Sequence, residues 1–143
     1  MCVCHTYSRV MTTTTELKLQ IGSWDENPYR EFDDGRKFTR AEVALADADA
    51  GLQASYEGLM FYAADGTSSY VTLMQITGTL DGRSGSFVLT GSGNYDGTTA
   101  AGESRIVPGS GTGELAGISG SASSSSTHED YPVMPLTLQY DLG

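Results

Sequence analysis

The chain has 143 residues, with 8 basic and 18 acidic side chains and a formal net charge of −10. This length is typical of one domain that buries a core without metals or disulfides. The negative charge repels phosphate backbones and anionic lipid surfaces, which argues against nucleic acid and membranes as partners. The longest apolar run, residues 59–64, is far shorter than the roughly 20 residues that span a bilayer.

Residues 1–15 are expected to form a flexible lead, and residues 16–143 a single domain. Within the lead, Cys2, Cys4 and His5 resemble half of a zinc site. Zinc requires four ligands, and His128 is the one other candidate, so neither a metal nor a cofactor is predicted. Because the chain has no disulfide framework and no apolar signal segment, a cytoplasmic location is expected.

Turn signals divide the rest of the chain at regular intervals. Four Asp-Gly pairs begin at positions 34, 65, 81 and 96, and such pairs are strong hairpin signals. The acidic run Asp47-x-Asp49-x-Gly51 lacks the distal ligands of a calcium loop, so it is interpreted as another hairpin loop. Eight β-strands are expected, at residues 16–24, 37–46, 53–63, 69–80, 86–95, 98–107, 118–124 and 134–142.

Eight short antiparallel strands in one domain indicate an all-β fold, either an up-and-down barrel or a sandwich. The barrel is favoured here, because closure removes open strand edges and leaves a lumen for one small ligand.

Five spaced motifs resemble one bacterial family, the domain of unknown function 3224. They are residues 23–29 (SWDENPY), 37–41 (KFTRA), 78–89 (GTLDGRSGSFVL), 107–117 (VPGSGTGELAG) and 138–141 (LQYD). The resemblance implies an eight-stranded barrel similar to allene oxide cyclases and dirigent proteins. Such barrels include cofactor-free cyclases and isomerases, some of which close rings on polyketide chains.

The chain departs from the family pattern at three places. Members tend to carry Glu-Arg or Gln-Arg at Met74-Gln75, Gln-His at Thr90-Gly91, and Trp at Ser104. If these positions face inward, the lumen is wider and more apolar than that of a typical relative.

Strand periodicity places a set of large side chains on shared faces. The predicted ligand-binding residues are Tyr56, Met60, Tyr70, Met74, Phe87 and Tyr140, with Gly91 leaving room and Trp24 closing one end of the barrel. A filled, ordinary barrel core is the alternative, and periodicity does not decide which face is inside.

Three residues are candidates for catalysis: Arg40, Glu57 and Tyr62. A carboxylate buried in an apolar barrel has a raised pKa and can act as a general acid or base. A tyrosine can donate a hydrogen bond to a developing enolate or carbonyl oxygen. The alternative for Arg40 and Glu57 is an exposed cross-strand ion pair.

The sequence therefore predicts a cofactor-free cyclase or isomerase. Its substrate would be a hydrophobic natural-product intermediate of polyketide type, and a pericyclic ring closure is one reaction that fits. The first alternative is a non-catalytic, lipocalin-like carrier of small apolar molecules, and the second is a structural barrel with a filled core. The expected partner is a small hydrophobic molecule, and the expected assembly is a monomer or homodimer.

Overall fold

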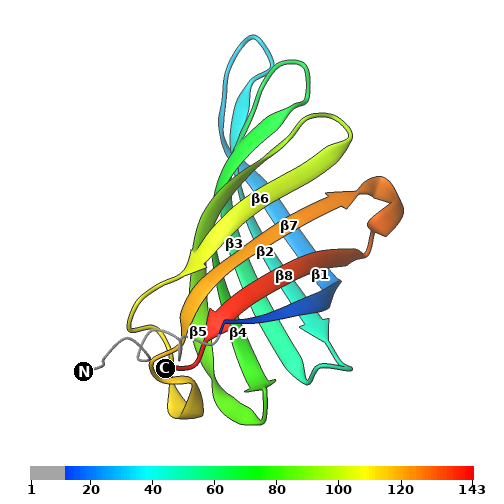
Figure 1. Cartoon of the computed structure of the whole chain (residues 1–143). Helices are drawn as coiled ribbons and strands as arrows, with labels where there is room; N and C mark the ends of the chain where they lie inside the picture. The colour runs from blue at the N-terminus through cyan, green and yellow to red at the C-terminus, as the bar shows by residue number, and fades with distance from the viewer. Residues whose placement is uncertain (1–11) are drawn as a thin grey trace, which may run out of the picture.

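Eight antiparallel strands close into a single barrel in chain order, so the predicted all-β barrel is confirmed (Figure 1). The structure is a computed structural model that describes residues 12–143. The strands are β1 (Thr13–Glu31), β2 (Lys37–Asp47), β3 (Leu52–Tyr62), β4 (Ser68–Leu80), β5 (Arg83–Tyr95), β6 (Thr99–Ile106), β7 (Ser119–Thr127) and β8 (Val133–Asp141). Two short 3-10 turns, η3 (Gly113–Leu115) and η4 (His128–Asp130), follow β6 and β7.

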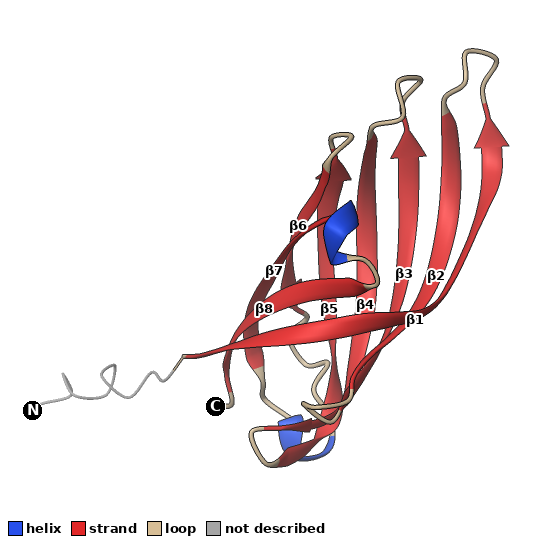
Figure 2. Ribbon diagram, turned by 90° about the vertical axis from the view of Figure 1, so that its right-hand side faces the viewer, coloured by secondary structure: helices blue, strands red, loops and turns tan. Residues whose placement is uncertain are grey.

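The two ends of the barrel differ. The hairpins β1–β2, β3–β4, β5–β6 and β7–β8 project from one end, which we call the open end (Figures 1 and 2). At the opposite end, the long β6–β7 connection folds under the barrel and carries η3. Leu115 and Ile118 of this connection are buried, and together they help to close the barrel there.

Strand β1 is longer than the sequence indicates and is shared between two neighbours. Its first part pairs with β8 over Thr13–Gln20, so residues 13–15 belong to the barrel and not to a flexible lead. From Gln20 onward it pairs with β2, with irregularities between Ile21 and Ser23 and between Pro28 and Arg30. Cys2, Cys4 and His5 lie outside the described residues.

The interior is built by strict alternation along the strands. Even-numbered residues of β3, β4, β6 and β8 face inward, as do odd-numbered residues of β2 and β5. The residues of lowest exposure include Leu19, Ile76, Phe87 and Leu138, which lie on four different strands. Their burial provides the main stabilising term of the fold. In the part of the chain that is described, no helix is long and apolar enough to cross a membrane.

Candidate functional site

A cavity of about 410 Å³ lies inside the open end of the barrel. This volume falls in the range of small-molecule sites, about 300–1,000 Å³. All eight strands contribute to this cavity, and most of the side chains that line it are aromatic or aliphatic. The lining residues are Ile21, Trp24, Val43, Leu45, Tyr56, Met60, Tyr62, Ser68, Tyr70, Tyr95, Thr98, Ala100, Ser126, Thr127, His128, Tyr131, Val133 and Met134. No Asp, Glu, Lys or Arg is among these described residues.

A smaller space of about 90 Å³ lies deeper in the barrel and shares Tyr56 and Tyr70 with the larger cavity. Met74 lines this smaller space. Ile76 and Phe87, which pair across β4 and β5, lie one step further in and are fully buried. The cavity therefore has a packed floor, and its opening faces the hairpins.

The irregularity in β1 determines which residues of this strand enter the site. Ile21 pairs with Leu45 and Ser23 with Ala44, so Gly22 is an extra residue in β1, a β-bulge. Before the bulge, odd-numbered residues face inward. After it, Trp24 and Glu26 pair with the inward-facing Val43 and Ala41 and share their face of the sheet.

Glu26 accepts three side-chain hydrogen bonds beside the cavity. The Tyr62 hydroxyl donates to Oε2 at 2.6 Å, the Thr39 hydroxyl donates to Oε2 at 2.7 Å, and the Trp24 indole donates to Oε1 at 2.9 Å. Burial raises the pKa of Glu26, but these bonds and the charge of Lys37 outweigh that effect, so its pKa is lowered overall. Glu26 is therefore an ionised group that holds two cavity-lining side chains in place.

Tyr62 is a fixed donor in this cluster. Burial raises the pKa of Tyr62, and the hydrogen bond to Glu26 raises it further, so the phenol stays protonated. Because its proton is donated to Glu26, Tyr62 cannot donate the same proton to a ligand. Lys37 lies 5.2 Å from the centre of the Tyr62 ring and packs against it.

A second polar contact lies across the opening, between Tyr95 of β5 and His128 of η4. The Tyr95 hydroxyl donates to the Gly97 carbonyl at 2.8 Å and lies 2.9 Å from His128 Nε2. The hydroxyl has one proton, so the donor in the contact with His128 Nε2 is set by the tautomer of His128. The two rings meet edge to face, with centroids 6.0 Å apart.

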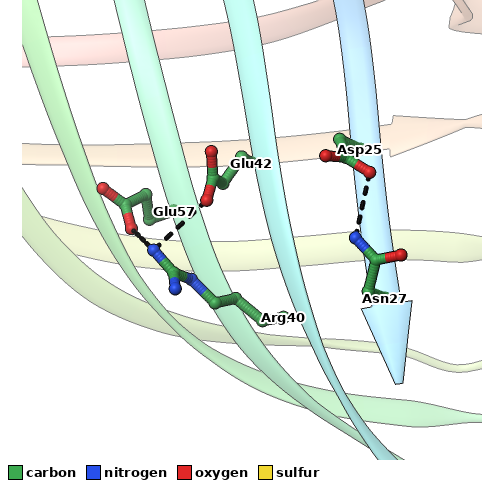
Figure 3. Close-up of polar contacts among 5 residues, drawn as sticks. All are labelled: Asp25, Asn27, Arg40, Glu42 and Glu57. Carbon is green, nitrogen blue, oxygen red and sulfur yellow. Dashed lines mark hydrogen bonds and ion pairs between the residues drawn. The ribbon is translucent and has the colours of Figure 1, made fainter. Parts of the chain in front are cut away.

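Arg40 and Glu57 lie on the outer surface of the barrel, so their predicted place in the lumen is wrong (Figure 3). Arg40 Nη2 lies 2.9 Å from Glu57 Oε1 and 3.2 Å from Glu42 Oε1, and all three side chains are more than half exposed. Asn27 and Asp25 form a further pair on this face, at 3.0 Å. Glu57 follows Tyr56 on β3, so alternation turns it outward when Tyr56 faces inward.

The other predicted site residues divide into two groups. Trp24, Tyr56, Met60, Tyr62 and Tyr70 line the main cavity, as the sequence predicts, and Met74 lines the smaller space. Phe87, Gly91 and Tyr140 do not line the main cavity.

Each of these three exceptions has a structural reason. Phe87 is fully buried in the floor, and Tyr140 is buried on β8, where it pairs with Gly120 and Thr13, far from the opening. A Cβ at Gly91 would collide with the Glu103 carbonyl and Ser104 of β6. Gly91 therefore permits close approach of β6 and does not widen the lumen.

Three residues at the cavity, Glu26, Tyr95 and His128, are not among the site residues predicted from the sequence. His128 is considered there only as a zinc ligand. Glu26 lies in the matched motif at residues 23–29, but the bulge that turns it inward leaves no clear sequence signal apart from Gly22. Tyr95 continues the inward alternation of Phe87 and Leu89, so strand periodicity was a usable signal. Among residues 12–143, no three His, Cys, Asp or Glu side chains are grouped so as to hold a metal ion.

Comparison with known proteins places this barrel among proteins whose function is unknown. No curated protein matches the chain. A crystal structure of a protein with unknown function from the DUF3224 family of Shewanella oneidensis MR-1 has a similar fold, with a TM-score of 0.69 and 25% sequence identity. The similarity covers 91% of this chain and 97% of that one. The model of the family described as "Protein of unknown function (DUF3224)" matches residues 16–140, and the chain therefore belongs to this family.

Proposed function

We propose that the barrel binds a small, neutral, mainly apolar molecule in the cavity at its open end. The observation that carries this proposal is a 410 Å³ space lined by aromatic and aliphatic side chains, in a chain of net charge −10. Such a lining gains free energy by removing apolar ligand surface from water, and a few hydroxyl groups orient the ligand.

We propose further that the bound molecule undergoes a cofactor-free cyclisation or isomerisation, such as a pericyclic ring closure of a natural-product intermediate. Both reactions rearrange bonds within one molecule. A closely fitting cavity favours them by holding a flexible chain in its reactive conformation. The similarity to allene oxide cyclases and dirigent proteins that the sequence motifs imply would support this step by analogy of fold alone.

We also propose that the protein is cytoplasmic and is a monomer or a homodimer. Its acidic charge argues against nucleic acid and anionic membranes as partners, because like charges repel each other at long range.

Binding can be tested with β-tetralone, a neutral bicyclic ketone small enough for the cavity. Trp24 is the one tryptophan of the chain and lines the cavity, so its fluorescence reports on occupancy. Saturable quenching of Trp24 is expected. Ala100→Phe places a ring in the lumen and is expected to weaken binding at least about tenfold, because the volume for the ligand is lost.

Ala101→Phe is the matched control, because Ala101 is the next residue of β6 and its side chain is exposed. This variant is expected to bind β-tetralone like the unmodified protein. Equal affinities of the two variants, or no saturable quenching at all, would contradict binding in the lumen.

Catalysis is separated from simple carriage by the fate of the ligand. Candidate linear polyene and enone substrates are incubated with the protein and with Ala100→Phe, and the products are compared by mass spectrometry and chromatography. A product of unchanged mass but altered retention, formed by the unmodified protein alone, supports the cyclase or isomerase. Recovery of every bound compound unchanged supports the carrier.

A further inference from the structure

Two of the tyrosine hydroxyls that line the cavity on β3 and β4 make no hydrogen bond to another described residue. Five tyrosines line the space, and one of them, Tyr131, is largely exposed to solvent. Of the four on β3, β4 and β5, Tyr62 donates to Glu26, and Tyr95 contacts the Gly97 carbonyl and His128. Within residues 12–143, the hydroxyls of Tyr56 and Tyr70 make no hydrogen bond. Because no buried side-chain oxygen or nitrogen among the described residues lacks a partner, these two hydroxyls are reached by solvent in the cavity. An occupant that displaces this solvent has to offer them a new partner, so the two groups are positioned to bond to it.

Tyr56 and Tyr70 lie on neighbouring strands, and each ring lies over a glycine. The Tyr56 hydroxyl lies 3.0 Å from the position that a Cβ of Gly58 would take. The Tyr70 ring lies against Gly93 of β5, where a Cβ would stand 2.7 Å from Tyr70 Cε1. These two glycines leave space for the rings to lie along the wall, with their hydroxyls beside the lumen.

Both phenols keep their protons. Burial is the main reason that the pKa of Tyr56 is raised, and the neighbouring Tyr70, Glu26 and Tyr62 raise it further. Burial also raises the pKa of Tyr70. At neutral pH, each phenol is therefore a neutral hydrogen-bond donor, and no Lys or Arg that would select an anionic ligand lines the main cavity within the described residues.

We propose that Tyr56 and Tyr70 donate hydrogen bonds to a carbonyl oxygen of the ligand, so that the ligand class is a neutral ketone, enone or lactone. This inference rests on the proposed binding of a small molecule in the lumen. A carbonyl oxygen has two lone pairs and no proton, so it can accept from both phenols at once. If the ligand reacts, the same two donors stabilise negative charge that develops on this oxygen.

The test compares β-tetralone with tetralin, which has a methylene group where the ketone has its carbonyl. Trp24 quenching gives both affinities. The unmodified protein is expected to bind the ketone more tightly. Tyr56→Phe and Tyr70→Phe are each expected to weaken ketone binding about fivefold and to leave tetralin binding unchanged, since one neutral hydrogen bond is lost. Tyr29→Phe, an exposed position outside the lumen, is the control and is expected to have no effect.

A measurement on the unmodified protein avoids any dependence on the folding of variants. The infrared stretch of carbonyl-labelled β-tetralone is expected to move to lower frequency on binding, relative to its value in an apolar solvent, because hydrogen bonding weakens the C=O bond.

The outcomes separate the two proposals. Two results overturn the carbonyl inference and leave ligand binding intact, provided that both probes bind tightly. One is an unshifted carbonyl stretch, and the other is an affinity for β-tetralone in the tyrosine variants equal to that of the unmodified protein. Binding of neither probe overturns the proposed function, and the carbonyl inference falls with it.

Discussion

Asp47 is a buried carboxylate whose role is to join two parts of the closed end. Its Oδ2 accepts the Lys18 amide of β1 at 2.8 Å, and its Oδ1 accepts the Ala50 amide of the β2–β3 turn at 3.1 Å. The side chain therefore satisfies backbone donors on two segments that are far apart in sequence. This explains why an acidic run that begins like a calcium loop is a hairpin loop instead, as the sequence predicts.

Asp47→Ala is expected to lower the free energy of unfolding by about 2 kcal/mol, because a charged acceptor is removed from two amides. Urea unfolding, followed by circular dichroism, measures this change. Asp49→Ala is the matched control: Asp49 is exposed, and its loss is expected to change stability by less than about 0.5 kcal/mol. Equal effects of the two substitutions would show that the Asp47 bonds contribute nothing to stability.

The two carboxylates Glu26 and Glu57 show how far the sequence predicts the site. Alternation along β3 places Tyr56, Met60 and Tyr62 on one face, and the structure confirms that this face is inside. The same alternation places Glu57 on the outer face. Glu57 and its neighbour Tyr56 therefore cannot both face the lumen. Strand periodicity does not predict the orientation of Glu26, because that orientation depends on the β-bulge at Gly22 of β1.

At the scale of elements, the four Asp-Gly pairs form two different kinds of turn. Asp34, Asp65 and Asp96 each accept a backbone amide two residues ahead, in hairpin loops of the open end. Asp81 instead has a φ of 54° and, with Gly82, forms the tight β4–β5 turn of the closed end. The sequence predicts all four reversals correctly, but the dipeptide alone does not distinguish the two geometries.

The β-bulge at Gly22 is the element-scale feature on which the site depends most. Deletion of Gly22 is expected to shift residues 23–31 by one position and turn Trp24 and Glu26 outward. Thr39 and Tyr62 then lose their shared acceptor, so the free energy of unfolding is expected to fall by about 1–3 kcal/mol. Quenching of Trp24 by β-tetralone is expected to disappear. Both quantities are measured on the purified variant.

Gly22→Ala tests the bulge without removing it. A Cβ at Gly22 meets only the Ala44 carbonyl, at 3.7 Å, which is an ordinary contact. This substitution is therefore expected to leave stability within about 0.5 kcal/mol and binding unchanged. A deletion variant as stable and as well quenched as Gly22→Ala would show that the register of β1 does not orient the site.

At the scale of the whole molecule, charge and cavity are separated. The chain carries a net charge of −10, yet no Asp, Glu, Lys or Arg lines the main cavity within the described residues. The outer surface carries charged side chains, among them Arg40, Glu42 and Glu57. A ligand therefore meets a negative surface first and then a lining without Asp, Glu, Lys or Arg, with the ionised Glu26 beside it.

This arrangement predicts selection against anions. Tetralin carboxylate is expected to bind at least about tenfold more weakly than β-tetralone, because a carboxylate loses its hydration in the cavity without gaining a cationic partner. Salt screens the repulsion between the carboxylate and the negative surface of the protein. The difference between the two affinities is therefore expected to narrow between about 0.01 M and 1 M salt, over which the screening length falls from about 30 Å to about 3 Å. Trp24 quenching measures both dependences. Tighter binding of the carboxylate than of the ketone would contradict an uncharged ligand.

Within the described residues, Ile76 and Phe87 form a packed floor that closes the cavity on the side away from the hairpins. A molecule that enters past the four hairpins must leave by the same route, so two molecules cannot pass in opposite directions. If the protein is an enzyme, its product competes directly with the next substrate, and product inhibition is competitive. The turnover rate then depends on how fast the product leaves through the open end. Substitutions in the hairpins are expected to change this rate without changing the rate of the chemical step.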